Sequence, residues 1–322
     1  MTAKAGAVAP RGGALPLSLD LLACPVTHAP LVENSGALST ADGRHRYPLD
    51  ASGIPLFAEQ TASEDARKQQ AHYDRIAQTY ETNLGYPHTQ EYMAYLDRVL
   101  FREIGSAPLG TMAELCCGHG EAMHLLEGRY ARAVGVDISL SMLQRARTSL
   151  PSVTLLQGDA TKLPLADAAF DTVVMLGGVH HVRDRLGLFR EVARILKPGG
   201  RFIYREPVSD FALWRWIRAV VYRVSPTLDH TTERPLLHEE TVPVLEQASL
   251  VSRRYTTVGF FGFCVFMNSD VLVFNRLFRF LPGIRAITRA AANFDDWVAG
   301  LPGFARSGLQ VVGIAEKPGR SA

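Results

Sequence analysis

The chain has 322 residues, of which 47% are apolar, and its 34 basic and 32 acidic side chains give a formal net charge of +2. This length and composition are typical of a globular protein with one large domain plus additions, or with two domains. The small charge offers no support for a nucleic-acid partner. No stretch is long and apolar enough to predict a transmembrane segment or a signal peptide. Four cysteines without a CxxC pair do not form a disulfide framework, so we expect a cytoplasmic protein.

The N-terminal third of the sequence divides into three parts. Residues 1–16 are rich in Ala, Gly and Pro, which predicts a disordered tail. Residues 17–58 contain many turn signals, such as ENSG and ADGRHRYP, and predict a small unit of short strands. Residues 59–110 open with the polar segment AEQTASEDARKQQ, which we interpret as a linker leading into N-terminal helices.

Residues 111–322 carry the pattern of an α/β domain. The short apolar runs MAELCC, RAVGVD, VTLLQGD and FDTVVML alternate with segments of helical periodicity, such as SLSMLQRARTSL and RDRLGLFREVARIL. This alternation predicts a Rossmann-like parallel sheet with helices on both faces. LKPGG is expected to end a helix before the strand RFIYRE, and VSRRYTTV and LQVVGIAEK to form the last two strands. An aromatic-rich insertion at 258–306 separates those two strands.

Acidic residues stand where three successive predicted strands end. Glu114 precedes the glycine turn after the first strand, Asp137 ends the second strand, and Asp159 follows the third. Asp137 could accept both hydroxyls of a ribose, and Asp159 an adenine amino group. The carboxyl ends of these strands should meet at one edge of the sheet. Capping of helices by these acids is the structural alternative.

The glycine turn argues against a dinucleotide. Gly118 and Gly120 allow a tight turn and a close approach of the backbone to a ligand. However, Met123 stands where dinucleotide-binding folds carry a third glycine, and Glu114 would repel a pyrophosphate. The pattern therefore favours a cationic nucleoside without phosphates.

Five motifs in chain order, ELCCGHG, VGVDIS, QGDATKLPLADAAFDTVVM, HHV and EVARILKPGG, resemble those of class I S-adenosylmethionine-dependent methyltransferases of the type 11, or UbiE-like, group. The resemblance covers roughly residues 70–206 and the strand at 309–316. It implies a seven-stranded sheet, S-adenosylmethionine as cofactor and S-adenosylhomocysteine as product. It also implies a set of cofactor-binding residues, which are Tyr73, Tyr80, Glu114, Gly118, Gly120, Asp137, Ile138, Asp159 and Ala160.

Three residues are candidates for catalysis. His180 and His181 follow the fourth strand, and one of them could act as a general base. Packing against the cofactor or capping of a loop is the alternative for both. Glu206 ends the fifth strand and could orient an acceptor or pair with an arginine. The absence of an NPPY-type tetrapeptide after the fourth strand makes a DNA or glutamine acceptor less favoured.

The insertion at 258–306 combines phenylalanines with arginines and is expected to form a lid over a hydrophobic acceptor. Simple packing on the sheet is an alternative, and a peripheral membrane contact is a third. Residues 19–58 resemble the Trm112-like zinc-ribbon module through LLACPV and YPLDASGIPLF. Only Cys24 remains of the paired cysteines and Thr27 stands at the second position, so we predict no metal. A scaffold or homodimer role for this module is open.

The leading hypothesis is methyl transfer to O, N or C of a small, hydrophobic or aromatic metabolite in a biosynthetic pathway. Two alternatives are a SAM-binding enzyme with other chemistry, such as cyclisation or decarboxylation, and a non-catalytic partner of another methyltransferase. Methylation of structured RNA is disfavoured because the sequence has no basic stripe.

Overall fold

The computed structural model describes residues 17–71, 82, 84–217, 234–267 and 273–319. The predicted tail at 1–16 lies outside the described residues, as do Tyr73 and Tyr80. Within the described residues no helix is both long enough and apolar enough to cross a membrane.

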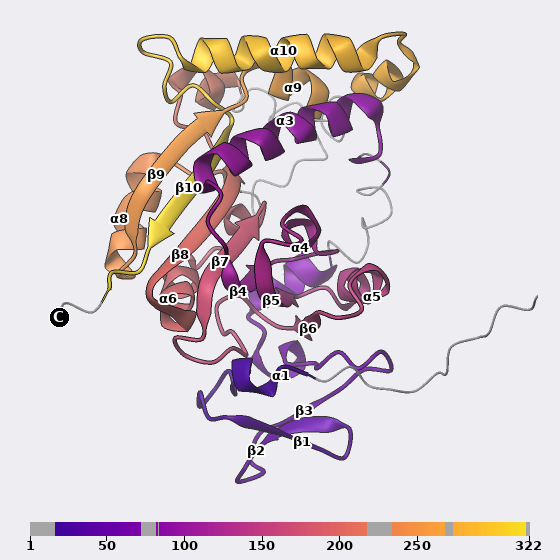
Figure 1. Cartoon of the computed structure of the whole chain (residues 1–322), viewed down its shortest axis with the longest axis vertical. Coiled ribbons are helices and arrows are strands. Elements are labelled where there is room, and N and C mark those ends of the chain that lie inside the picture. Colours follow the sequence, from indigo (N-terminus) through magenta and orange to yellow (C-terminus); the bar gives the residue numbers. More distant parts are fainter. Residues whose placement is uncertain (1–16, 72–81, 83, 218–233, 268–272, 320–322) are drawn as a thin grey trace, which may run out of the picture.

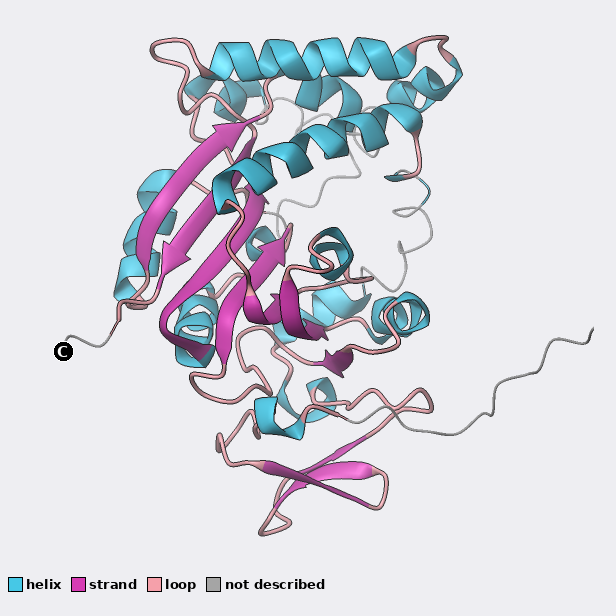
Figure 2. Cartoon of the chain, viewed as in Figure 1, coloured by secondary structure: helices cyan, strands magenta, loops and turns pink. Residues whose placement is uncertain are grey.

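The strands form two sheets (Figure 2). They are β1 (Leu31–Asn34), β2 (Ala37–Thr40), β3 (Arg46–Pro48), β4 (Gly110–Leu115), β5 (Tyr130–Asp137), β6 (Thr154–Gln157), β7 (Phe170–Leu176), β8 (Leu196–Pro207), β9 (Val251–Val258) and β10 (Gln310–Glu316). The small sheet has the order β1-β2-β3 and is antiparallel. The large sheet has the order β6-β5-β4-β7-β8-β10-β9.

The large sheet is parallel except for β10. Strand β4 pairs in parallel with β5 and with β7, and β10 runs antiparallel to β8 and β9. The chain moves outward from β4 to β6 and then returns to the other side of β4 with β7, which makes a switch in strand order there. The predicted Rossmann-like, seven-stranded methyltransferase sheet is thus confirmed.

The helices whose bounds lie within the described residues are α1 (Ala58–Thr61), α3 (Pro87–Ile104), α4 (Glu121–Leu125), α5 (Leu140–Ser149), α6 (Arg185–Ile195), α8 (His238–Gln247), α9 (Phe261–Met267) and α10 (Ile284–Ala299), with 3-10 turns η1 (Leu19–Leu21), η2 (Val179–His181) and η3 (Val273–Phe280). Residues 64–71 and 212–217 are also helical. Their starts follow from the sequence. Ser139 caps α5 by accepting the N–H of Met142, Asp184 caps α6 by accepting that of Gly187, and Pro87 opens α3.

Side chains along each strand point alternately to the two faces of the sheet, and this produces two core clusters, one on each face. In β4, Ala113 and Leu115 belong to the cluster that α6 and α8 cover, whereas Met112 belongs to the cluster covered by α3, α4 and α5. Helices on both faces are therefore confirmed. One expectation was wrong: α6 ends at Ile195 and LKPGG lies inside β8, where the pairing with β7 shifts and absorbs the proline and glycines as an irregularity.

The N-terminal unit, residues 17–58, packs directly on the large sheet and is not separated from it by a linker. Leu56 pairs in parallel with Gln157 of the edge strand β6, and backbone bonds of 2.9 and 3.0 Å link Gln157 to Phe57 and Pro55. Leu22 and Tyr47 are fully buried in the same cluster as the strands of the large sheet. The unit therefore extends the main core. Its resemblance to Trm112-like modules stays a prediction.

The insertion between β9 and β10 contributes α9, η3 and α10, which pack with α3 (Figure 1). Figure 1 shows these helices at the end of the molecule opposite the three-stranded sheet.

Candidate functional site

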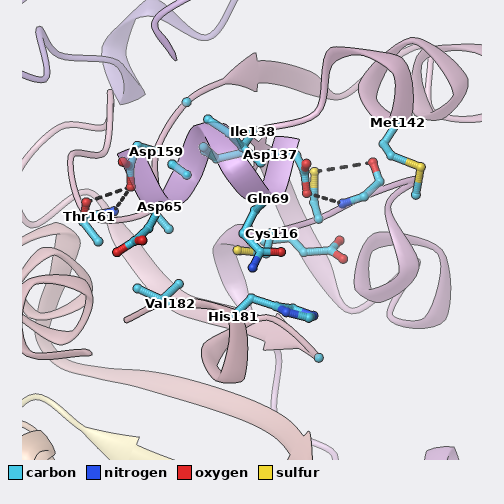
Figure 3. Close-up of a pocket in the computed structure, with 18 of the residues that line it drawn as sticks. Asp65, Gln69, Cys116, Asp137, Ile138, Met142, Asp159, Thr161, His181 and Val182 are labelled. Carbon is cyan, nitrogen blue, oxygen red and sulfur yellow. Dashed lines mark hydrogen bonds between the residues drawn. The ribbon is translucent and has the colours of Figure 1, made fainter. Parts of the chain in front are cut away.

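A cavity of about 300 Å³ opens where β4, β5, β6 and β7 end, at the switch in strand order (Figure 3). Residues from five segments line it, and they are Ser63, Asp65, Ala66, Gln69, Glu114, Cys116, Cys117, Gly118, His119, Glu121, Val136, Asp137, Ile138, Met142, Gly158, Asp159, Ala160, Thr161, Lys162, Leu176, Gly177, His181, Val182, Arg183 and Asp184. The three acids that the sequence placed at strand ends therefore share one hollow.

The turn after β4 has an unusual backbone. Cys116, Gly118 and Gly120 all have positive φ angles, of 50°, 50° and 89°. A side chain on Gly120 would collide with Leu150 Cδ1, so this position favours glycine for space as well as for conformation. The turn thereby brings backbone atoms close to the cavity without an intervening side chain.

Glu114 holds the start of α4. Its two carboxylate oxygens accept the backbone N–H groups of Ala122 and Met123 at 2.9 and 2.8 Å. Burial raises the pKa of Glu114 to about 8, although the two N–H donors act in the opposite direction and favour the charged form. A cation placed in the cavity would shift this balance toward the carboxylate.

Asp137 and Asp159 each bind two segments of backbone. Asp137 accepts the N–H of Gly118 and of Ser139, both at 2.8 Å. Asp159 accepts the N–H of Ser63 at 2.9 Å through one oxygen, and the N–H and hydroxyl of Thr161 through the other. Both carboxylates line the cavity, and Asp159 Oδ2, which accepts the Ser63 N–H, can accept a second bond from a ligand hydroxyl or amine.

These bonds use backbone N–H groups that would otherwise bind an anion at this turn. In phosphate-binding folds the N–H groups of the glycine turn and of the following helix bind the phosphate. Here Gly118 donates to Asp137, and Ala122 and Met123 donate to Glu114. Carboxylates therefore accept the N–H groups to which a pyrophosphate would bind. The site suits a nucleoside that lacks phosphates and carries positive charge.

The segment 63–71 forms one wall of the cavity. Ser63 caps a helix at 64–71, where its hydroxyl accepts the N–H of Ala66 at 3.2 Å. Asp65 and Gln69 line the cavity from this helix (Figure 3), and Asp65 Oδ2 lies 3.5 Å from Arg183 Nε. The segment read as a linker is therefore part of the site, and Ser63 is fixed to it through Asp159.

Glu206 lies behind the turn that follows β7. Its fully buried carboxylate accepts the N–H groups of Gly178, Val179 and His180, and lies 2.8 Å from His180 Nδ1. Burial raises the pKa of Glu206 to about 7 against the effect of these donors. The rings of His180 and His181 are in contact, with centroids 3.8 Å apart.

The predicted site residues separate into three groups. Those that line the cavity are Glu114, Gly118, Asp137, Ile138, Asp159, Ala160 and His181. Gly120, His180 and Glu206 support the lining from behind. Tyr73 and Tyr80 lie outside the described residues.

Sequence reasoning missed several lining residues. Cys116, His119 and Thr161 belong to the motifs already singled out, and their place beside the glycines and Asp159 was the available signal. Ser63 and Gln69 gave no such signal, because they lie in a polar segment about ninety residues before Asp159, and only the fold brings that segment to the cavity.

The described residues of the insertion at 258–306 contribute nothing to the cavity lining, so the predicted lid remains a prediction. Cys24, the one remaining cysteine of the expected zinc-ribbon pattern, lies 3.1 Å from the Tyr47 hydroxyl. In the parts of the chain that the structure describes, no group of three or more His, Cys, Asp or Glu side chains could hold a metal ion.

Comparison with known proteins shows which sequence model and which folds this chain is similar to. Residues 113–204 match the sequence model described as a methyltransferase domain. A demethylmenaquinone methyltransferase of Staphylococcus aureus is 29% identical over 153 residues, which cover 45% of this chain and 63% of that protein. The match thus spans less than two thirds of this curated relative.

Two solved structures share the fold. The [4+2]-cyclase SpnF aligns with a TM-score of 0.56 and 17% identity, over 79% of this chain and 96% of its own. A protein from Galdieria sulphuraria, provisionally assigned as a sarcosine dimethylglycine methyltransferase, aligns with a TM-score of 0.51 and 17% identity, over 71% and 88% of the two chains. At this identity the likeness establishes the fold alone.

Proposed function

We propose that this chain, whose residues 113–204 match a methyltransferase domain, is a class I S-adenosylmethionine-dependent methyltransferase that transfers a methyl group to O, N or C of a small, hydrophobic or aromatic acceptor. The cofactor of the domain is S-adenosylmethionine. The acceptor and the atom methylated are the parts that we propose.

One observation carries the assignment of the cavity to this cofactor. The N–H groups of Gly118, Ala122 and Met123 are bound by carboxylates that also line the cavity. Such a site favours a sulfonium and an ammonium group and disfavours phosphates.

Each part of the cofactor can then be assigned to residues around the cavity. Asp137 would accept the ribose hydroxyls, and Asp159 with Ala160 would hold the adenine. Ile138 and Met142 supply apolar contact for the adenine and ribose rings. Gly118 would let the methionine part approach the backbone. Glu114 acts by holding the N-terminus of α4 in place.

When bound, the cofactor supplies a methyl group on a positively charged sulfur. The chain must align an acceptor with that methyl and exclude water, and such positioning can lower the barrier substantially. His181 lies on the cavity wall and would take a proton from an acceptor hydroxyl. Glu206 positions this histidine indirectly, because it fixes the 178–180 turn and the ring of His180 that contacts His181.

An apolar acceptor is supported by the wall next to His181, where Leu176 and Val182 line the cavity. The relative named as a demethylmenaquinone methyltransferase also supports a ring-bearing, hydrophobic acceptor. A cytoplasmic location, a homodimer and a scaffold role for the N-terminal unit belong to the same proposal and rest on the sequence alone.

The test is incubation of the purified chain with S-adenosylmethionine and a panel of phenols, quinols and amines, read by mass spectrometry for a gain of one methyl group. The expected result is transfer to a ring-bearing acceptor that is lost in Asp137→Asn. Tight cofactor binding with a rearranged but unmethylated product would instead support cyclisation. Cofactor binding without any turnover would favour a non-catalytic partner.

A further inference from the structure

The exposed apolar side chains of this protein are concentrated in one region. Among the described residues, twelve large apolar side chains are exposed, and nine of these lie between positions 213 and 297. They are Leu213, Trp216, Phe261, Leu277, Phe280, Leu281, Ile287, Phe294 and Trp297. Six of the nine fall on η3, α10 and the turn that joins them, so the concentration has a defined structural basis.

Helix α10 turns apolar side chains toward solvent while it buries polar ones. Ile287, Phe294 and Trp297 are 51%, 48% and 61% exposed, and their spacing of seven and three residues places them on one side of the helix. Asp295 and Thr288 are fully buried on the opposite side. The helix therefore presents an apolar face that the described residues leave uncovered.

The buried polar side of α10 has its own partners, so the orientation of the helix is well determined. The Asp295 carboxylate accepts the Tyr92 hydroxyl at 2.5 Å and the N–H groups of Gly262 and Phe263 at 3.0 and 3.1 Å. Rotation of the helix to bury Phe294 and Trp297 would break these bonds and leave a buried carboxylate unpaired, which is costly.

Basic side chains lie on the same two elements as the apolar face. Arg276 and Arg279 lie on η3, and Arg285 and Arg289 on the first turns of α10. The Arg279 guanidinium lies over the rings of Phe280 and Tyr86, with centroid distances of 4.7 and 5.2 Å. The acids of the same stretch are Asp295, which is buried, and Asp296.

Glu91 of α3 offsets only part of this positive charge, since it lies 2.8 Å from Arg289 and 3.9 Å from Arg285. The face is thus apolar, and the elements that form it carry a cationic excess. This combination distinguishes it from an ordinary packing surface.

We propose that the exposed face of η3 and α10 docks on an anionic lipid bilayer. This docking face consists of Leu277, Phe280, Leu281, Ile287, Phe294 and Trp297, together with the four arginines. Aromatic and aliphatic side chains enter the boundary between headgroups and acyl chains, and arginines bind the phosphates above it.

The shape of the protein suits this partner. Figure 1 shows α10 as the outermost element at one end of the molecule, running across its long axis. A helix of 16 residues is about 24 Å long, so it offers an extended strip that can lie in the plane of a membrane. The three-stranded sheet at the opposite end would remain in water.

Charge argues against a second copy of the chain as the occupant. A twofold dimer would place the docking face against itself and bring its arginines near those of the partner. Like charges brought together at an interface oppose association, whereas anionic lipid headgroups neutralise them.

The experiment uses the full chain and sedimentation with two kinds of vesicle, pure phosphatidylcholine and phosphatidylcholine with phosphatidylglycerol. The wild-type protein should bind the anionic vesicles, and brominated lipids should quench its tryptophan fluorescence. The double variant F294Q/W297Q should bind roughly tenfold less or weaker still. The matched control V26Q/V32Q removes two apolar side chains, 55% and 47% exposed, at the other end of the molecule and should bind like the wild type.

A charge-reversal pair tests the electrostatic part. Arg279→Glu should lower binding to anionic vesicles by about tenfold, whereas Arg44→Glu, on the N-terminal unit, should have little effect. Thermal melting of each variant checks that the fold is kept.

Failure of the wild type to bind anionic vesicles would overturn the proposal, as would equal binding by F294Q/W297Q. A concentration-dependent dimer in analytical ultracentrifugation that F294Q/W297Q abolishes, without vesicle binding, would assign the face to a second copy. The measurement needs neither cofactor nor acceptor, so its outcome is independent of methyl transfer.

Discussion

The carboxylate of Asp137, at the end of β5, accepts the backbone N–H of Gly118, in the turn after β4, at 2.8 Å. This bond links the end of β5 to the turn that follows β4. The same carboxylate lines the cavity, so one side chain both shapes the turn and faces the ligand.

Asp137→Asn should therefore weaken cofactor binding strongly. An amide can no longer accept both hydroxyls of a ribose with full charge, and the bond to Gly118 is weakened. We expect S-adenosylmethionine affinity to fall by at least about tenfold, the effect of losing roughly one charged hydrogen bond. Isothermal titration calorimetry measures this directly.

Asp171→Asn is the matched control. Asp171 accepts the N–H of Thr111 at 2.9 Å and binds Lys197 at 2.8 Å, but it lies at the amino end of β7 and does not line the cavity. This variant should lower stability while cofactor affinity stays near the wild-type value. Equal losses of affinity in the two variants would show that Asp137 acts only on the fold.

Glu114 should couple cofactor binding to pH. Its pKa is raised to about 8, so at neutral pH a bound cation must shift the carboxyl toward its charged form. Binding of S-adenosylmethionine should release protons, and affinity should increase as the pH rises from about 6.5 to 8.5. Calorimetry in buffers of different ionisation enthalpy counts the protons. S-adenosylhomocysteine, which lacks the sulfonium charge, should show a smaller slope, and Glu114→Gln should show almost none.

The raised pKa of Glu114 also affects the stability of the protein without cofactor. Because the folded pKa of Glu114 lies above its ordinary value of 4.5, its contribution to stability is complete below that value and is lost as the pH rises through about 8. Denaturant titrations of wild type and Glu114→Gln should therefore converge at low pH and diverge at high pH. Parallel curves would contradict the raised pKa.

Gly120→Ala should damage both fold and site. Gly120 and Gly128 both have left-handed backbones, with φ angles of 89° and 79°, but only at Gly120 would a methyl group collide with a neighbour, Leu150 Cδ1. Gly128→Ala should cost about 1 kcal/mol for its backbone alone. Gly120→Ala should cost about 1–3 kcal/mol more and displace the start of α4. Thermal unfolding gives the stability, and a fall in cofactor affinity specific to Gly120→Ala is expected.

Tyr47→Ala should destabilise the whole chain in a single transition. Tyr47 is fully buried, its ring packs on Phe57 at 4.5 Å, and it belongs to the core cluster that also holds strands of the large sheet. A loss of about 3–5 kcal/mol is typical for removing a buried aromatic ring. Calorimetric unfolding with two separate transitions, only the first of them shifted, would instead indicate an independent N-terminal domain.

Substitutions at His181, on the cavity wall, and at Glu206, behind it, should affect turnover and not cofactor binding. His181→Ala should lower kcat by about 10²- to 10⁴-fold if the acceptor loses a proton. Glu206→Gln should lower kcat less and shift its pH profile, since the amide cannot accept all the N–H groups of the 178–180 turn. Unchanged pH profiles in both variants would remove His181 from proton transfer.

Much of the fold was accessible from sequence because its signals are local. Local sequence patterns predict these elements directly. The apolar runs before Asp137 and Asp159 predict strands, and the glycines after Glu114 predict a turn. The approach of these carboxylates to one cavity then follows from the rule that parallel strands end at a common edge.

The remaining features depend on long-range contacts that local periodicity does not encode. Ser63 reaches Asp159 only because the N-terminal segment runs along β6, where Leu56 extends the sheet. Helix α10 is amphipathic in sequence, but the bonds of Asp295 decide which side is buried. The place of Glu206 behind its turn likewise required the pairing of β7 with β8.

Calorimetry with the purified chain decides whether the cavity binds a cationic nucleoside without phosphates. We expect one site per chain for S-adenosylmethionine, binding of S-adenosylhomocysteine at the same site, and no heat from NAD. Binding of NAD with no heat from S-adenosylmethionine would contradict this expectation.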